Sequence, residues 1–143
     1  LDGSALSADP TWIVGFSDLT ALHAWAGHHG VASLHAAVAG TQARTADSEL
    51  LWSALRNPVP FTAGRCLGLP DERPVVGGNL SVLFSLLGTP WFPKVDGAWL
   101  LVEDLDEYLY HLDRMWNQFE HQLIFLRMIL QQKTSSLDRS SQR

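Results

Sequence analysis

The fold of this 143-residue chain is decided by residues 11–28, which read TWIVGFSDLTALHAWAGH. Residues 12–14 form a short apolar run that ends at a glycine, which is the pattern of a buried strand. From Asp18 to Gly27, apolar side chains recur at intervals of three and four residues, which is the helical period. The stretch therefore predicts a strand, a tight turn and a helix in direct succession.

Several later segments also have the period or the bounds of regular structure. We expect a second strand within 31–38, helices over 47–55, 80–87 and 105–119, and a strand over 98–102. Gly77-Gly78-Asn79 is interpreted as the opening of the helix that begins at Leu80. Residues 123–130 fit either a continuation of the last helix or another strand.

A proline-rich stretch divides the chain. Residues 56–74 carry four prolines, which prevent a long helix, and we interpret them as a linker. Residues 1–55 are then the end of one domain, and residues 75–133 are part of a second domain. Residues 134–143 are rich in serine and arginine and are expected to form a disordered tail.

The composition excludes several classes of protein. Hydrophobic residues make up 46% of the chain, so a wholly disordered chain is excluded. A formal charge of −5 supplies no basic field for phosphates, so nucleic acid is not an expected partner. The single cysteine, Cys66, cannot form an internal disulfide, and no Cys/His set has zinc-finger spacing. No apolar run reaches the roughly 18 to 20 residues that span a bilayer, so no membrane partner is expected.

Ser17 is the sharpest chemical signal in the sequence. A serine between a buried strand and a helix is exposed at the carboxyl end of the strand, beside free N–H groups that stabilise an oxyanion. This placement suits a nucleophile. Alternatively, Ser17 or Asp18 is only the N-cap of the helix, and spacing alone favours that interpretation.

Glu103 and Asp104 form an acidic pair after the strand expected over 98–102. A carboxylate fixed at a strand end is well placed to orient a histidine that activates a serine. The alternative is that these acids meet the positive end of the next helix dipole, and spacing alone favours it.

The histidines do not resolve these alternatives, because none has a context that marks it as a general base and none has the spacing of metal ligands. They are His23, His28, His29, His35, His111 and His121.

Five short sequence blocks of the chain resemble, in the same order, the signature motifs of a known protein family. They are Gly15 to His23 (GFSDLTALH), Gly77 to Ser81 (GGNLS), Leu87 to Pro90 (LGTP), Leu101 to Asp104 (LVED) and Tyr110 to Met115 (YHLDRM). Together they resemble the signature blocks of the bacterial LD-carboxypeptidases. These serine peptidases are also called muramoyltetrapeptide carboxypeptidases, and the microcin self-immunity peptidases are their relatives.

The resemblance implies an α/β fold with the end of a flavodoxin-like amino-terminal domain and the first part of a swivelling β-barrel-like carboxy-terminal domain. By block matching, it implies that Ser17 is the nucleophile, that Glu103 is the triad glutamate, and that the N–H of Asp18 is an oxyanion donor. It further implies removal of the terminal D-alanine from murein tetrapeptides during peptidoglycan recycling. The family works in the cytoplasm, without a metal or another cofactor, and often as a homodimer.

The chain also departs from the family pattern, and we expect it to be truncated at both ends. The triad histidine of the family comes well after the Glu103 block, beyond the residues present here. The family's His-Gly-Pro block appears only as Leu34-His35-Ala36-Ala37. The alternative function is therefore a catalytically incomplete fragment that acts, if at all, as a non-enzymatic binding or dimerising module.

Overall fold

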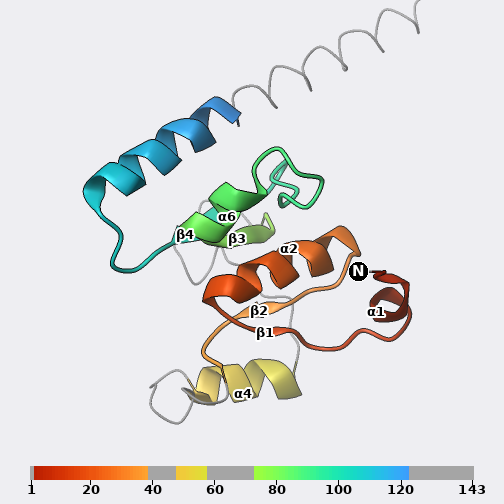
Figure 1. Cartoon of the computed structure of the whole chain (residues 1–143). Helices are drawn as coiled ribbons and strands as arrows, with labels where there is room; N and C mark the ends of the chain where they lie inside the picture. Colours follow the sequence, from red (N-terminus) through yellow and green to blue (C-terminus); the bar gives the residue numbers. More distant parts are fainter. Residues whose placement is uncertain (1, 39–47, 58–72, 123–143) are drawn as a thin grey trace, which may run out of the picture. The chain divides into compact units, whose positions relative to one another are not determined.

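The computed structural model describes residues 2–38, 48–57 and 73–122. The chain forms two compact units, Leu1–Asp104 and Leu105–Arg143 (Figure 1). Helices and parallel strands alternate along the first unit, so the α/β class is confirmed.

The first half of the unit Leu1–Asp104 carries the predicted strand, turn and helix. Its elements are α1 (Ser4–Ala8), β1 (Val14–Gly15), the 3₁₀ helix η1 (Ser17–Leu19), α2 (Thr20–His28) and β2 (Leu34–His35). β1 and β2 pair in parallel, with Gly15 opposite His35, so the second strand lies within the predicted range. β1 begins two residues later than expected because the short β2 runs beside only this part of the chain.

The second half of the same unit is a strand, a helix and a parallel strand. These are β3 (Val75–Asn79), α6 (Leu80–Leu86) and β4 (Trp99–Glu103). The register places Val75 opposite Trp99 and Asn79 opposite Glu103. The predicted helix after Leu80 and the predicted strand before Asp104 are thus confirmed, each within one residue at its end.

The interpretation of Gly77-Gly78-Asn79 as a helix opening missed a strand. These residues are the last three of β3, and the helix begins only at Leu80. Glycine is a poor strand former, which hid the strand from a reading of periodicity. Both glycines have positive φ, 133° for Gly77 and 144° for Gly78. A Cβ at Gly77 would overlap the backbone oxygen of Leu101, so the two strands approach closely because this residue lacks a side chain.

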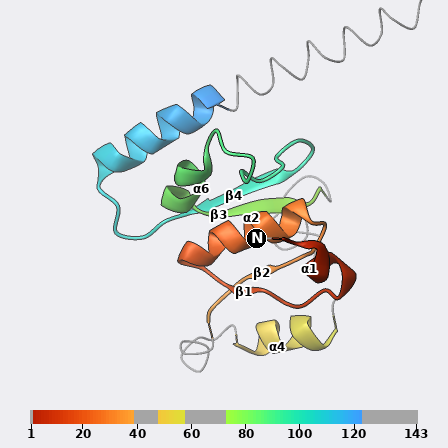
Figure 2. The same cartoon turned by 45° about the vertical axis from the view of Figure 1, so that its right-hand side comes forward.

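The core of the first unit lies around α2. This helix contacts β2, β3 and α6. In both views it lies between the β1–β2 pair and the β3–β4 pair (Figures 1 and 2). The buried apolar side chains include Ala24 and Ala26 on α2 and Leu80 and Leu83 on α6.

The helix α4 (Ser48–Arg56) confirms the helix predicted over 47–55. Leu51 is its buried residue, whereas Leu50 and Trp52 are exposed.

The unit Leu105–Arg143 contributes a helix over residues 109–122 to the described structure. The prediction began this helix at Leu105, four residues too early. Asp106 adopts a φ of 61°, in the left-handed region, and so interrupts helical geometry before the helix starts.

The other predictions on the chain's organisation stay predictions. Residues 58–72 of the expected linker, the segment 123–130 and the tail 134–143 lie outside the described residues. Among the described residues, no helix is long and apolar enough to cross a membrane.

Candidate active site

Ser17 lies where the chain leaves β1 and enters the helices. It follows Phe16, whose backbone is extended, and it is the first residue of η1. Its φ of 57° is in the left-handed region, which costs a serine about 1 to 2 kcal/mol relative to the usual helical conformation. Such strain persists only where the surrounding structure imposes it, and it is often found at functional sites.

The capping interpretation of Ser17 and Asp18 is wrong. The N-cap residues are Phe16 for η1 and Leu19 for α2, and neither helix start has a side-chain cap hydrogen bond. The Ser17 side chain is therefore not used as a cap, and the residue is exposed. This exposed serine on a strained turn has the placement that a nucleophile requires.

His23 supports the strand before Ser17. It lies on α2 with 9% of its surface exposed, and its Nε2 is 3.0 Å from the backbone oxygen of Gly15. A carbonyl only accepts hydrogen bonds, so Nε2 carries the proton. Burial lowers the pKa of His23, and the nearby His35 lowers it further, although the hydrogen bond to Gly15 opposes both effects. His23 is thus a neutral, buried histidine that fixes the peptide two residues before Ser17.

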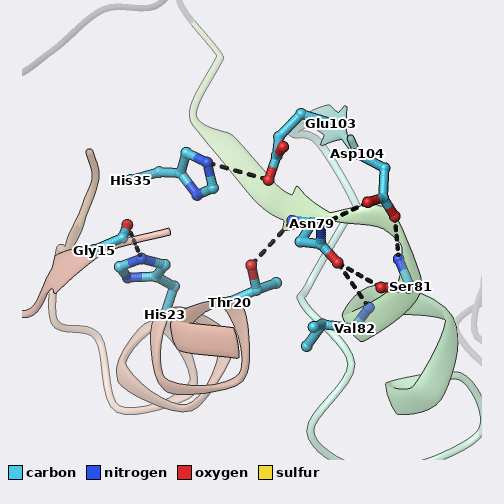
Figure 3. A network of polar contacts seen from close by, with 9 residues as sticks. All are labelled: Gly15, Thr20, His23, His35, Asn79, Ser81, Val82, Glu103 and Asp104. Atoms are coloured by element: carbon cyan, nitrogen blue, oxygen red, sulfur yellow. Dashed lines mark hydrogen bonds and ion pairs between the residues drawn. The ribbon is translucent and has the colours of Figure 1, made fainter. Parts of the chain in front are cut away.

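Glu103 ends β4 and faces a histidine. Its Oε1 lies 3.5 Å from Nε2 of His35, which ends β2 (Figure 3). At this distance the two side chains form an ion pair only when His35 is protonated, and the separation is longer than a typical hydrogen bond. The two side chains are 36% and 26% exposed, so solvent weakens the attraction.

The helix-dipole interpretation of Glu103 is also wrong. The residue belongs to β4, and the next described helix begins only at residue 109. Dipole effects are confined to the first turn of a helix.

Asn79, at the end of β3, is the centre of a second polar group. Its backbone N–H donates to Thr20 Oγ1 at 2.9 Å, and its Nδ2 donates to Asp104 Oδ1 at 3.1 Å. Its Oδ1 accepts from Ser81 Oγ at 2.7 Å and from Val82 N at 3.2 Å, which caps α6. Asp104 Oδ2 accepts from Ser81 N at 3.1 Å (Figure 3).

The structure brings some of the candidate residues together and not others. Glu103 meets His35, but among the described residues no histidine is hydrogen-bonded to Ser17. No group of three or more histidine, cysteine or acidic residues within the described part of the chain could hold a metal ion.

Sequence reasoning missed the contact of His35 with Glu103 and the role of Asn79 as a hub. Both signals were present in weak form. His35 stands in the remnant of a family block, and Asn79 precedes a helix, where asparagine is a preferred cap. Their partners, however, are distant in the sequence: Glu103 lies 68 positions after His35, and Thr20 lies 59 positions before Asn79. Contacts at such separations leave no local periodic signal in the sequence.

Comparison with known proteins identifies the family. The chain matches the model of the LD-carboxypeptidase N-terminal domain over residues 1–36 and that of the LD-carboxypeptidase C-terminal domain over residues 72–129. It is 35% identical over 132 residues to a Bacillus subtilis (strain 168) protein named "Probable murein peptide carboxypeptidase". That match covers 84% of this chain and 41% of the relative.

Two solved structures are similar to the chain. A muramoyltetrapeptide carboxypeptidase from Oxalobacter formigenes has a TM-score of 0.66 and 26% identity, over 85% of this chain and 45% of that one. An MccF-like protein from Bacillus anthracis str. Ames has a TM-score of 0.67 over 85% of this chain and 48% of its own, with 18% identity, and it supports the fold alone.

The chain therefore belongs to the LD-carboxypeptidase family of peptidases. It spans about two fifths of the length of the curated relative from Bacillus subtilis.

Proposed function

We propose that this chain supplies the nucleophile and the glutamate of an LD-carboxypeptidase that removes the terminal D-alanine from murein tetrapeptides. The observation that carries the proposal is the exposed Ser17 on a left-handed turn directly after β1, within the family's own block. The name of the Bacillus subtilis relative supports a murein peptide as the substrate.

The proposed mechanism assigns one role to each residue. Ser17 Oγ attacks the carbonyl carbon of the L,D peptide bond and gives its proton to a histidine, which passes it to the leaving D-alanine amine. The N–H of Asp18, at the start of η1, donates to the oxyanion. Glu103 holds the histidine in its productive tautomer. Water then releases the acyl group from Ser17, with the same histidine as the base.

The wider setting in this proposal follows the family resemblance. Residues 1–55 belong to a flavodoxin-like domain and residues 75–133 to a swivelling β-barrel-like domain, with the linker 56–74 between them. The enzyme acts in the cytoplasm, in peptidoglycan recycling, as a homodimer, and uses no cofactor.

One observation favours the alternative, a non-enzymatic binding or dimerising module. Ser17 has no histidine partner among the described residues, and a serine without a base is a weak nucleophile. We therefore expect the isolated chain to release no more D-alanine from a murein tetrapeptide than its Ser17→Ala variant does. Turnover that depends on Ser17 in the isolated chain would mean that a histidine of this chain is the base.

The catalytic roles are tested in a chimaera in which this chain replaces the aligned segment of the Bacillus subtilis relative. We expect D-alanine release that falls by about 10⁶-fold in Ser17→Ala and by about 10⁴-fold in Glu103→Gln. Ser53→Ala is the matched control, because Ser53 is an exposed serine on α4 and should leave the rate unchanged. A chimaera without activity beside an active parent, or one in which Ser17→Ala is fully active, would refute the proposal.

A further inference from the structure

Asn79 uses its backbone N–H and both polar atoms of its side chain in hydrogen bonds, and only 8% of the residue is exposed. An asparagine that served only as the N-cap of α6 would need the side-chain oxygen alone. The other two contacts reach Thr20, on α2, and Asp104, which directly follows β4 (Figure 3).

Both of these contacts end beside a proposed catalytic residue. Thr20 is the first residue of α2, three positions after Ser17, and it is fully buried. Asp104 directly follows Glu103. Asn79 therefore joins the helix that follows the Ser17 turn to the strand end that carries Glu103.

The contact with Asp104 also bears on the direction of Glu103. Successive side chains of an extended chain point to opposite sides. Asp104 is held on one side by Asn79 Nδ2 and Ser81 N, and Glu103 reaches His35 on the other side (Figure 3). A strand end that is fixed through Asp104 therefore keeps the Glu103 carboxylate directed at His35.

We propose that Asn79 is a positioning residue, which sets the Ser17 turn relative to Glu103 through Thr20 and directs Glu103 toward His35 through Asp104. The catalytic value of this role rests on the proposed function. The geometric part of the proposal does not rest on it, because that part concerns only the hydrogen bonds that the Asn79 backbone N–H and side chain make in the folded protein.

The test measures the placement of the Glu103 side chain by NMR on the full chain, without turnover. The probe is the nuclear Overhauser effect between the Glu103 side chain and the ring protons of His35. Asn79→Asp keeps a capping oxygen for α6 but has no donor for Asp104, which it would repel. We expect this variant to stay folded and to lose at least half of the Glu103–His35 signal.

Ser81→Ala is the matched control. It removes the hydroxyl bond to Asn79 Oδ1 but keeps the backbone N–H that holds Asp104, so the Glu103–His35 signal should persist. An undiminished signal in folded Asn79→Asp, or an equal loss in Ser81→Ala, would overturn the proposal.

The hydrogen bond from the Asn79 N–H to Thr20 is tested by a separate experiment, which does not depend on whether Asn79→Asp folds. Thr20→Val removes the acceptor of the Asn79 amide at nearly constant volume, and Thr20→Ser restores it. We expect amide hydrogen exchange at Asn79 to accelerate by about tenfold in Thr20→Val and to return to the original rate in Thr20→Ser. Equal exchange rates in both variants would refute this half of the proposal.

These outcomes separate the inference from the proposed function. An active chimaera together with an unchanged Glu103–His35 signal in Asn79→Asp would reject only the positioning role. Loss of the Glu103–His35 signal in Asn79→Asp, together with a chimaera whose activity is unchanged by Ser17→Ala, would reject only the proposed peptidase function.

Discussion

Because α2 lies close to β3, we expect Gly78→Ala to lower the free energy of unfolding by a large amount. Gly78 has a φ of 144°, which is accessible almost only to glycine. A Cβ at this position would lie 2.5 Å from Thr20 Oγ1 and 2.8 Å from Thr20 Cγ2. The substitution therefore strains the backbone and also pushes Thr20 away from the N–H of Asn79.

The magnitude follows from three contributions. The unfavourable backbone conformation costs about 1 to 3 kcal/mol, overpacking against Thr20 costs about 1 to 3 kcal/mol, and the weakened bond to Asn79 costs about 1 kcal/mol. We expect a loss of about 3 to 7 kcal/mol in the free energy of unfolding, measured by urea denaturation. This loss is a large share of the stability of an ordinary domain.

Two comparisons isolate the cause. Gly27→Ala is the matched control, since Gly27 is within α2 and a Cβ there would meet nothing within 4 Å. It should be neutral or should stabilise the protein by up to about 1 kcal/mol. In a Thr20→Ala background, Gly78→Ala should lose most of its overpacking cost, about 1 to 3 kcal/mol. An equal cost of Gly78→Ala in both backgrounds would refute the packing argument.

Two further predictions concern the candidate site. Burial lowers the pKa of His23 in the folded protein from its ordinary value of 6.5. The stability that the neutral His23 contributes is therefore fully present above pH 6.5, and it is lost as the pH falls toward the lower pKa of the folded state. His23→Gln keeps a donor for Gly15 O without titrating there. The free energy of unfolding from urea denaturation should therefore fall more steeply between pH 8 and pH 5 in the wild-type chain, with an extra slope of at most about 1.4 kcal/mol per pH unit; parallel curves would contradict this. Ser17→Gly relieves the left-handed strain that Ser17→Ala retains, so thermal unfolding should find the glycine variant more stable by about 1 kcal/mol, and an alanine variant of equal or higher stability would show that the turn is unstrained.

Local sequence patterns predicted much of the fold. The apolar run before Gly15 predicted β1, and the helical period from Asp18 predicted α2. Both patterns are visible in the sequence because apolar side chains are placed where each element is buried. The same reasoning missed β3, whose sequence Val-Val-Gly-Gly-Asn lacks the side chains that usually mark a strand. Those glycines reflect tertiary contacts instead, with Leu101 for Gly77 and with Thr20 for Gly78. No local period reports contacts of that kind.

The site was predictable to the extent that it is local. The Ser17 turn follows from the order of strand and helix, and neither helix start has a side-chain cap hydrogen bond, whereas the nucleophile role of Ser17 stays a prediction. The partner of Glu103 was not predictable, because a histidine on β2 can meet a carboxylate on β4 only through tertiary packing. Spacing in the sequence favoured a helix dipole for Glu103, since spacing alone cannot tell the end of a strand from the start of a helix.

Four residues of the candidate site lie at the carboxyl ends of strands, and the parallel direction of the strands explains this placement. β1 pairs in parallel with β2, and β3 pairs in parallel with β4, so in each pair both carboxyl ends lie at one edge. Ser17 follows β1, His35 ends β2, Asn79 ends β3 and Glu103 ends β4. In open α/β sheets, ligand sites form beyond the carboxyl ends of the strands. Ser17, His35 and Glu103 thus occupy positions from which a strand can present a side chain to a substrate, and the buried Asn79 occupies the equivalent position on β3. The four residues are dispersed over 87 positions of the sequence, from 17 to 103.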